Sequence, residues 1–121
     1  MNAAILYEGK IVGIAGYNVI DWSNKIAYIG YWLGGSYQGN GIMTRVAEAL
    51  TDYAIIQLEL NRVDIRAAAN NKKSWSIPDR LGFKEEGLIR QAEWLYDHYV
   101  DHVVFGMLAE DWKKRPELEG N

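Results

Sequence analysis

Hydrophobic and polar positions alternate along the first third of the chain, and the pattern then changes to a helical period. Short β-like runs at residues 3–7, 11–20 and 26–33 are separated by polar turns, which predicts a three-strand meander. Between residues 42 and 58, apolar residues recur every three or four positions while charged residues mark the opposite side. That spacing predicts an amphipathic helix of about four to five turns.

Alternation returns at residues 62–68, which predicts a strand after the helix. Residues 70–74 offer turn and N-cap side chains for a short helix that runs to Leu81. Gly82 is its expected left-handed C-cap, and Pro78 is expected near its first turn. The strand, helix, strand order between residues 26 and 68 requires a right-handed crossover, so those two strands should be parallel neighbours.

The last part of the chain predicts an antiparallel hairpin and a loose tail. Residues 83–94 and 99–108 form two β-like runs around a polar turn at residues 96–98. The charged tail from residue 110 is expected to fray, because only Trp112 and Leu118 offer large apolar side chains there. Outside the crossover, the strands are expected to pair antiparallel.

The composition narrows the class of protein further. The chain has 121 residues, 49% of them apolar, so we expect one domain over residues 1–121. The strand and helix pattern above makes it an α/β domain of mixed type. It has no apolar run of membrane-spanning length and no signal-like opening, which favours a cytoplasmic protein without membrane contact. The absence of cysteine excludes disulfides and thiolate chemistry, and the net charge of −3 argues against nucleic-acid binding.

The clearest chemistry lies in a glycine-rich stretch, residues 34–44, between a predicted strand and the predicted long helix. Backbone N–H groups at such a helix start can bind phosphate. A mononucleotide P-loop needs Lys-Ser/Thr where Asn40 and Gly41 stand, and the dinucleotide fingerprint needs a small residue where Thr44 stands. Neither nucleotide motif fits, and a purely structural tight turn is the alternative.

The run Gln38-Gly39-Asn40-Gly41-Ile42-Met43 resembles the Gln/Arg-x-x-Gly-x-Gly/Ala pyrophosphate loop of the GNAT superfamily of N-acetyltransferases. Met43 stands where a small residue is usual, a departure familiar in the branch that acetylates protein N-termini, including ribosomal-protein-serine acetyltransferases. Further segments are similar to that branch: the strand at 28–33, the Asn-x-x-Ser segment from Asn71 to Ser74, Leu81-Gly82-Phe83, and the hairpin residues 90–93 with Asp101.

The resemblance implies a GNAT fold, with a mixed, mostly antiparallel sheet that splays between the parallel strands ending at Leu33 and Ala68. Acetyl-coenzyme A (acetyl-CoA) would lie in that gap. Its pyrophosphate would meet the glycine loop and the start of the long helix, and its pantetheine arm would pair with the backbone of residues 32–33. The cofactor-binding residues implied are Trp32, Leu33, Gln38, Gly39, Asn40, Gly41, Met43, Thr44, Asn71, Lys73 and Ser74.

The implied reaction is direct attack of an amine on the thioester in a ternary complex. A backbone N–H of the 32–33 region, assigned to Leu33, would stabilise the oxyanion. Ser74 is the candidate proton donor to the departing thiolate, although a serine here could instead cap the short helix. Glu93 and Asp101 lie where this branch shapes its acceptor site, and either could accept the amine proton through water or simply be a solvated strand carboxylate.

Two pairs of residues invite ligand roles. Lys72 and Lys73 flank the expected cofactor arm and could contact the 3′-phosphate of coenzyme A, or they could be solvated surface lysines. His98 and His102 are four apart in a predicted strand, which separates them by about 13 Å. One ion cannot bind both, so no metal is expected.

The resemblance begins in the family's second strand, so the opening strand and the two helices after it have no counterpart. Because those helices normally wall the acceptor pocket and cover part of the sheet, their absence predicts exposed apolar surface. We expect either a homo-oligomer, in which a second copy covers that surface, or a shortened form with reduced stability.

The function implied is an acetyl-CoA-dependent N-acetyltransferase, an acyltransferase whose acceptor is a protein or peptide N-terminal α-amine, as in ribosomal protein acetylation. Two alternatives stay open from the residues alone. One is a non-catalytic acyl-CoA-binding or structural module, and the other is a small-amine or antibiotic acetyltransferase, which the same cofactor motifs would serve.

Overall fold

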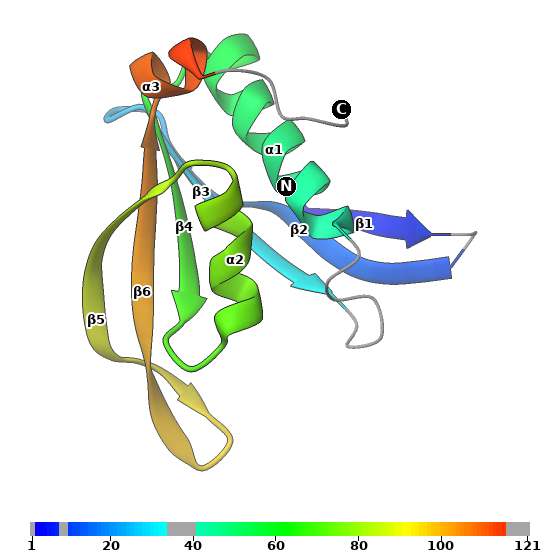
Figure 1. Cartoon of the computed structure of the whole chain (residues 1–121), viewed down its shortest axis with the longest axis vertical. Coiled ribbons are helices and arrows are strands. Elements are labelled where there is room, and N and C mark those ends of the chain that lie inside the picture. The colour runs from blue at the N-terminus through cyan, green and yellow to red at the C-terminus, as the bar shows by residue number, and fades with distance from the viewer. Residues whose placement is uncertain (1, 8–9, 34–40, 116–121) are drawn as a thin grey trace.

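The computed structural model describes residues 2–7, 10–33 and 41–115, and shows a mixed sheet with helices packed against it (Figure 1). The sheet has six strands in the order β1-β2-β3-β4-β6-β5. β3 and β4 are parallel, and the other neighbours are antiparallel, which confirms the predicted meander, crossover and hairpin. The strands are β1 Asn2–Tyr7, β2 Lys10–Asp21, β3 Ile26–Leu33, β4 Arg62–Ala68, β5 Lys84–Leu95 and β6 His98–Leu108.

Alternation along the central strands directs one set of side chains into the core. Val63, Ile65 and Ala67 of β4 are buried, and so are Ala27 and Ile29 of β3, which stand opposite the first two. Removing these aliphatic groups from water is the main favourable contribution to folding, at roughly 25 cal/mol per Å² of apolar surface. The hydrophobic pattern of both strands therefore fixes which face of the sheet the helices cover.

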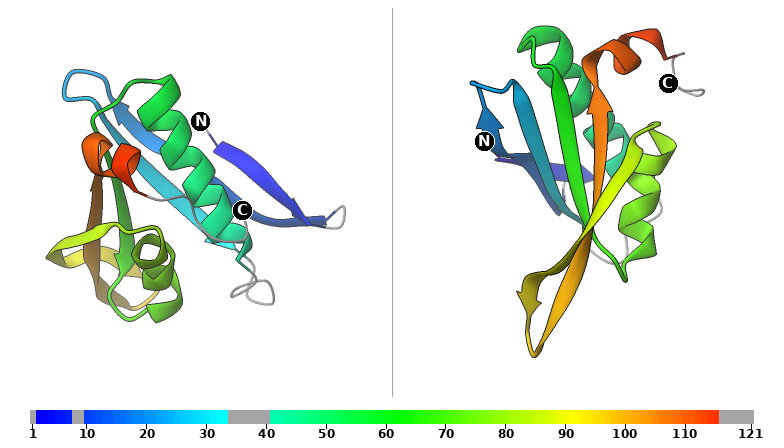
Figure 2. Two further views of the ribbon diagram at one scale, coloured as in Figure 1. Left: turned by 45° about the horizontal axis from the view of Figure 1, so that its top comes forward. Right: turned by 90° about the vertical axis from the view of Figure 1, so that its left-hand side faces the viewer.

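Helices α1 (Ile42–Asp52) and α2 (Lys72–Arg80) lie on that face, as Figures 1 and 2 show. α1 continues into a π-helical turn, η2 (Tyr53–Gln57), so the single helix predicted over 42–58 changes its hydrogen-bond spacing. Near this change, the Tyr17 hydroxyl of β2 donates to the Leu50 carbonyl, and burial raises the pKa of Tyr17 to about 12. A side chain that bonds to a helix carbonyl is a known cause of such irregularities.

Helix α2 begins earlier than predicted and ends as predicted. Gly82 has a φ of +86° and its N–H bonds to the Asp79 carbonyl, while the N–H of Phe83 bonds to the Pro78 carbonyl, which confirms the left-handed C-cap. Pro78 lies in the last turn, not near the first, because the helix already starts at Lys72. Ser74 is the third residue of this helix, so it does not stand at the N-cap position.

The prediction that the tail frays is wrong for helix α3 (Ala109–Lys114). The Trp112 side chain is only 4% exposed, and its indole N–H donates to Asp52 Oδ1 at 3.1 Å. The Arg115 guanidinium lies 3.6 Å from the centre of the Trp112 ring and pairs with Glu48 of α1. One large aromatic ring thus supplies the burial and the cation–π contact that hold this segment on α1.

Candidate active site

β3 and β4 pair only over their first halves, and the last residues in register are Ile29 and Ile65. Beyond them, residues 30–33 of β3 keep β2 as a neighbour, whereas residues 66–68 of β4 keep β6. The two strands therefore diverge toward their C-terminal ends, as Figure 1 shows, and we call the region between residues 30–33 and 66–68 the opening. Backbone groups that lose a strand partner need another, so the opening suits an extended ligand that carries amides.

Helix α1 starts near the C-terminal end of β3 (Figure 1) with a residue in the left-handed region. Gly41 has a φ of +77°, and a Cβ placed on it would meet nothing within 4 Å among the described residues. The first-turn N–H groups of residues 42–44 have no partner inside the helix. They form the positive end of the helix dipole, which suits an anion such as a phosphate. Three predicted loop residues lie outside the described part of the chain: Gln38, Gly39 and Asn40.

Met43 takes two roles that the sequence motif does not separate. Its side chain is 2% exposed and packs beside Ala15 of β2, with Tyr31 and Val46 around it. A flexible thioether side chain fills such an irregular gap well. Its backbone N–H stays in the first turn of α1, as does that of the half-buried Thr44. A large residue fits this motif position because its side chain enters the core.

The Asn-x-x-Ser segment and the hairpin meet at the end of β4. The carbonyl of Ala68, the last residue of β4, accepts the backbone N–H of Asn71 at 2.9 Å and the indole N–H of Trp75 at 2.8 Å. Ala68 also stands opposite His102 of β6 in the register. The structure thus brings two separately predicted segments to one wall of the opening. The side chains of three predicted residues lie outside its description: Lys72, Lys73 and Ser74. The same holds for the side chains of Trp32 and Leu33, whose backbone belongs to β3.

Strand β5 carries a bulge that the sequence pattern did not reveal. The register passes from Ile89 directly to Glu93, so residues 90–92 stand opposite Asp101 alone. Asp101 Oδ1 accepts the backbone N–H of Gln91 at 2.7 Å, and Gln91 has a left-handed φ of +50°. A carboxylate that fixes a bulge is a structural group. Of the two predicted proton acceptors, Asp101 therefore binds the protein's own backbone.

Glu93, the other predicted proton acceptor, lies 3.0 Å from His102, measured from Oε1 to Nε2. Its side chain is 48% exposed, whereas that of His102 is 19% exposed, so the carboxylate is accessible and the imidazole is largely enclosed. Sequence reasoning missed His102 as a site residue because it tested only a metal shared with His98. The contact depends on the bulge register, for which the sequence carries no signal that we recognise.

Two features are absent from the described ranges, which are residues 2–7, 10–33 and 41–115. No group of three or more histidine, aspartate or glutamate side chains there is arranged to hold a metal ion. No helix there is long and apolar enough to cross a membrane.

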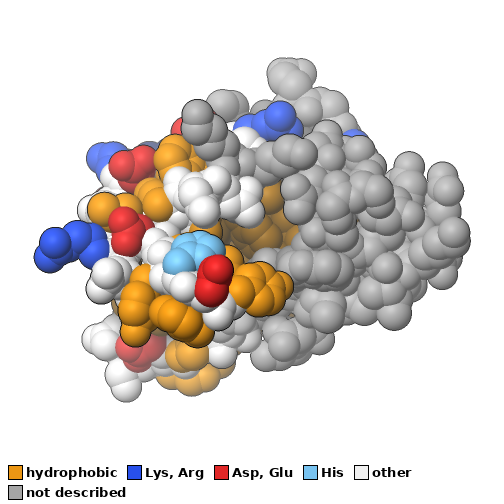
Figure 3. All heavy atoms as spheres, turned by 90° about the horizontal axis from the view of Figure 1, so that it is seen from below, with side chains coloured by type: hydrophobic (Ala, Val, Ile, Leu, Met, Phe, Trp, Pro, Cys, Tyr) orange, Lys and Arg blue, Asp and Glu red, His pale blue; other side chains and the backbone are white. Residues whose placement is uncertain are grey.

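Large hydrophobic side chains are exposed at the tip of the β5–β6 hairpin. Trp94 and Tyr99 pack edge to face with ring centres 4.9 Å apart, although more than half of each side chain is exposed. Figure 3 views the molecule from the hairpin end and shows hydrophobic side chains around a histidine and an acidic side chain. Other large hydrophobic side chains exposed in the described part are Val19, Trp22, Tyr53, Ile56, Leu88 and Tyr96. Whether a second copy covers exposed apolar surface stays a prediction.

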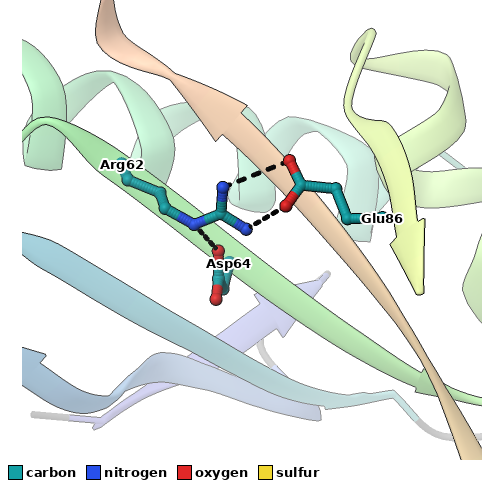
Figure 4. Close-up of polar contacts among 3 residues, drawn as sticks. All are labelled: Arg62, Asp64 and Glu86. Atoms are coloured by element: carbon teal, nitrogen blue, oxygen red, sulfur yellow. Dashed lines mark hydrogen bonds and ion pairs between the residues drawn. The ribbon is translucent and has the colours of Figure 1, made fainter. Parts of the chain in front are cut away.

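An ion-pair network lies on the sheet face opposite α1 and α2 (Figure 4). Arg62 of β4 contacts Asp64 at 2.6 Å through Nε and binds both carboxylate oxygens of Glu86 on β5 through its two Nη atoms. The guanidinium crosses β6 at Gly106, where a Cβ would come within 2.5 Å of Arg62 Nη2. Burial raises the pKa of Asp64, whereas the hydrogen bond from Arg62 lowers that of Glu86. The network ties β4 to β5 across β6.

Replacing Arg62 by methionine should lower the free energy of unfolding at neutral pH by about 2–3 kcal/mol, because a mostly buried Asp64 carboxylate loses its partner. Without Arg62 the folded-state pKa values of Asp64 and Glu86 rise, so the folded variant binds protons more readily than wild type. Its deficit should therefore be largest above the ordinary aspartate pKa of 3.8 and should shrink as pH falls below neutrality. Urea titrations between pH 4 and pH 7.5 measure this dependence.

The control for this prediction is Arg66→Met, which removes a guanidinium from the same strand at an exposed position. We expect that variant to lose less than about 1 kcal/mol. Equal losses for the two variants, or a deficit of Arg62→Met that grows on acidification, would contradict the role given to the network.

Comparison with known proteins places this geometry in a family. The family profile described as "Acetyltransferase (GNAT) domain" matches residues 1–84. The putative ribosomal N-acetyltransferase YdaF of Bacillus subtilis is 38% identical over 113 residues, which cover 93% of this chain and 62% of the relative. The ribosomal-protein-serine acetyltransferase of Escherichia coli is 39% identical over 106 residues, which cover 88% and 59%. The chain therefore spans less than two thirds of the length of these relatives.

Solved structures give the same picture. A probable acetyltransferase superposes with a TM-score of 0.89 at 38% identity and covers 93% of this chain and 64% of its own. The ribosomal L7/L12 α-N-protein acetyltransferase RimL, in complex with coenzyme A, superposes with a TM-score of 0.81 at 33% identity and covers 88% and 60%. Because the profile match extends over most of the chain and these structures share its sheet and helices, the chain belongs to the family of GNAT acetyltransferase domains.

Proposed function

We propose that this chain transfers an acetyl group from acetyl-CoA to an amine, and that the amine is the α-amine of a protein or peptide N-terminus. The observation that carries the proposal is the opening between β3 and β4, with the start of α1 at Gly41 beside it. A structure of RimL contains coenzyme A, and the microcin C7 self-immunity acetyltransferase, with a TM-score of 0.80, contains acetyl-CoA. The names of the two curated relatives support a ribosomal protein as acceptor.

The residues of the chain fit this co-substrate. Acetyl-CoA supplies an acetyl group activated as a thioester. Backbone groups of Trp32 and Leu33, on the part of β3 that β4 has left, would pair with the pantetheine amides. Asn71 lies on the other wall, and Lys72 and Lys73, which follow it in the sequence, would contact the 3′-phosphate. The pyrophosphate would be held by the loop and the first turn of α1, namely Gln38, Gly39, Asn40, Gly41, Met43 and Thr44.

The chemistry that remains for the protein is orientation, charge stabilisation and proton transfer. The backbone N–H of Leu33 donates to the oxygen that gains negative charge when the amine nitrogen bonds to the acetyl carbon. The carbon–sulfur bond then breaks, and the Ser74 hydroxyl gives its proton to the leaving sulfur and regains one from solvent. Glu93 takes a proton from the amine through a water molecule. Its half-exposed carboxylate on the hairpin suits that role.

A small amine or antibiotic is the second candidate acceptor. It is favoured by the 35% identity to the microcin C7 self-immunity acetyltransferase, which covers 89% of this chain. The exposed aromatic side chains at the hairpin tip favour a peptide, because Trp94 and Tyr99 offer a surface much larger than a small amine can cover. We also propose that the protein forms a homo-oligomer and that it is located in the cytoplasm.

Calorimetric titration with acetyl-CoA, followed by a thiol-release assay, tests the function. We expect saturable binding at micromolar ligand and thiol release that depends on peptides with a free α-amine. The same peptides with a blocked N-terminus serve as matched controls and should give no release. No detectable binding would contradict the whole proposal. Binding without turnover on peptides, polyamines or aminoacyl nucleotides would favour the non-catalytic module instead.

A further inference from the structure

His102 is placed to hold Glu93, and no part of the proposed reaction uses it. Its Nε2 atom lies 3.0 Å from Glu93 Oε1, and four fifths of its side chain is buried. Its other ring nitrogen, Nδ1, is fully buried and has no hydrogen-bond partner among the described residues. One nitrogen of the ring therefore faces the carboxylate, and the other is enclosed by the sheet.

The register of the hairpin creates this contact. Glu93 stands opposite Val100, which makes His102 its diagonal neighbour on β6. If the pairing of Ile89 with His102 continued without the bulge, Gln91 would occupy the position opposite Val100. The bulge moves Glu93 into that position. The hydrogen bond from the Gln91 N–H to Asp101 fixes the geometry of the bulge. Two separate features of the hairpin therefore act on the same carboxylate.

The chemistry of the two groups decides which one donates. An ionised carboxylate only accepts hydrogen bonds, so the Nε2 atom of His102 carries the proton in this contact. The buried Nδ1 atom has no partner among the described residues, so the ring makes its polar contact through the Nε2–H group. Through this group the ring binds Glu93 Oε1 in one orientation and leaves Oε2 available to a water molecule or an amine.

We propose that His102 is a positioning residue, which holds the Glu93 carboxylate in the orientation that accepts the proton of the incoming amine. This inference rests on the proposed function and adds a residue to it. No bond to His102 forms or breaks, since the amine proton moves through water to Glu93 Oε2 and the Nε2 proton stays on the ring. His102 contributes to the rate by increasing the fraction of time for which the Glu93 carboxylate points toward the acceptor.

Nitrogen NMR spectra test the contact independently of activity. The chain has two histidines, and the second, His98, pairs with Asp97 at an exposed position, so a His98→Leu variant assigns the ring signals. We expect the Nε2 atom of His102 to carry a hydrogen-bonded proton. Replacing Glu93 by leucine should shift the Nε2 proton signal and leave His98 unchanged. An Nε2 atom without a proton, or spectra that Glu93→Leu does not alter, would overturn the inference.

Kinetics of two His102 variants test what the contact does. Leucine removes the donor, whereas a glutamine amide can donate to Glu93 from nearly the position of Nε2. We expect His102→Leu to lower kcat by about tenfold or more, with an unchanged KM for acetyl-CoA, and His102→Gln to stay within about threefold of wild type. Thermal unfolding should show both variants folded, and His98→Leu should keep wild-type kcat.

The outcomes separate the two proposals. Equal kcat losses for the leucine and glutamine variants would show that the ring acts only by packing and would overturn the positioning role. A wild-type protein that binds acetyl-CoA but gives no turnover on any acceptor would contradict the proposed function, while the NMR spectra still decide whether His102 orients Glu93.

Discussion

A Gly41→Asp variant should bind acetyl-CoA at least about a hundredfold more weakly than wild type. Gly41 has a φ of +77°, and a Cβ there would meet no described residue within 4 Å beside the first turn of α1. A carboxylate at that position would face the pyrophosphate, and two like charges a few ångströms apart near a protein surface repel by about 4 kcal/mol. It would also occupy the positive end of the helix dipole in place of the ligand. Calorimetric titration measures the loss.

The matched control is Gly41→Asn, which has the same shape without the charge and adopts left-handed φ values readily. We expect this variant to lose less than about tenfold in affinity, from side-chain bulk alone. Increasing the salt concentration should reduce the difference in acetyl-CoA affinity between the two variants, because salt screens the repulsion. Equal affinities for the aspartate and asparagine variants would show that the pyrophosphate lies elsewhere.

A Glu93→Gln variant should lose about a hundredfold in kcat with the affinity for acetyl-CoA unchanged. The amide keeps the shape of the side chain and can still accept the hydrogen bond from His102, but it cannot take a proton. General base catalysis typically contributes about 10²–10⁴-fold. The thiol-release assay at saturating acetyl-CoA measures this loss with the best peptide acceptor.

Two variants of neighbouring carboxylates sharpen this test. Glu85→Gln removes a charge from an exposed position on the same strand and should keep wild-type kcat. Asp101→Asn should cost at most about tenfold, because its amide oxygen can still accept the Gln91 N–H that fixes the bulge. If Asp101→Asn lost more activity than Glu93→Gln, the roles of the two carboxylates would have to be exchanged.

Local patterns were sufficient for most of the secondary structure because their causes are local. Alternation in β4 and the helical period of α1 each follow from which side chains must leave water. The left-handed residue at Gly82 was predictable because a helix end there favours glycine. The prediction for the tail was wrong for the opposite reason. Trp112 is buried against α1, a helix about sixty positions away in the sequence. The local sequence around Trp112 does not indicate that this helix face will be its neighbour.

The sequence by itself determined the strand order through the crossover, the class of the domain, and the loop and Asn-x-x-Ser segments that point to acetyl-CoA. Each of these depends on residues that are close together along the chain or on a short motif. The tertiary structure alone decided where β3 and β4 separate, which is after Ile29 and Ile65, that Met43 points into the core, and that Glu93 meets His102. Those three outcomes depend on register and packing between segments distant in sequence, where a shift of one or two residues changes every neighbour.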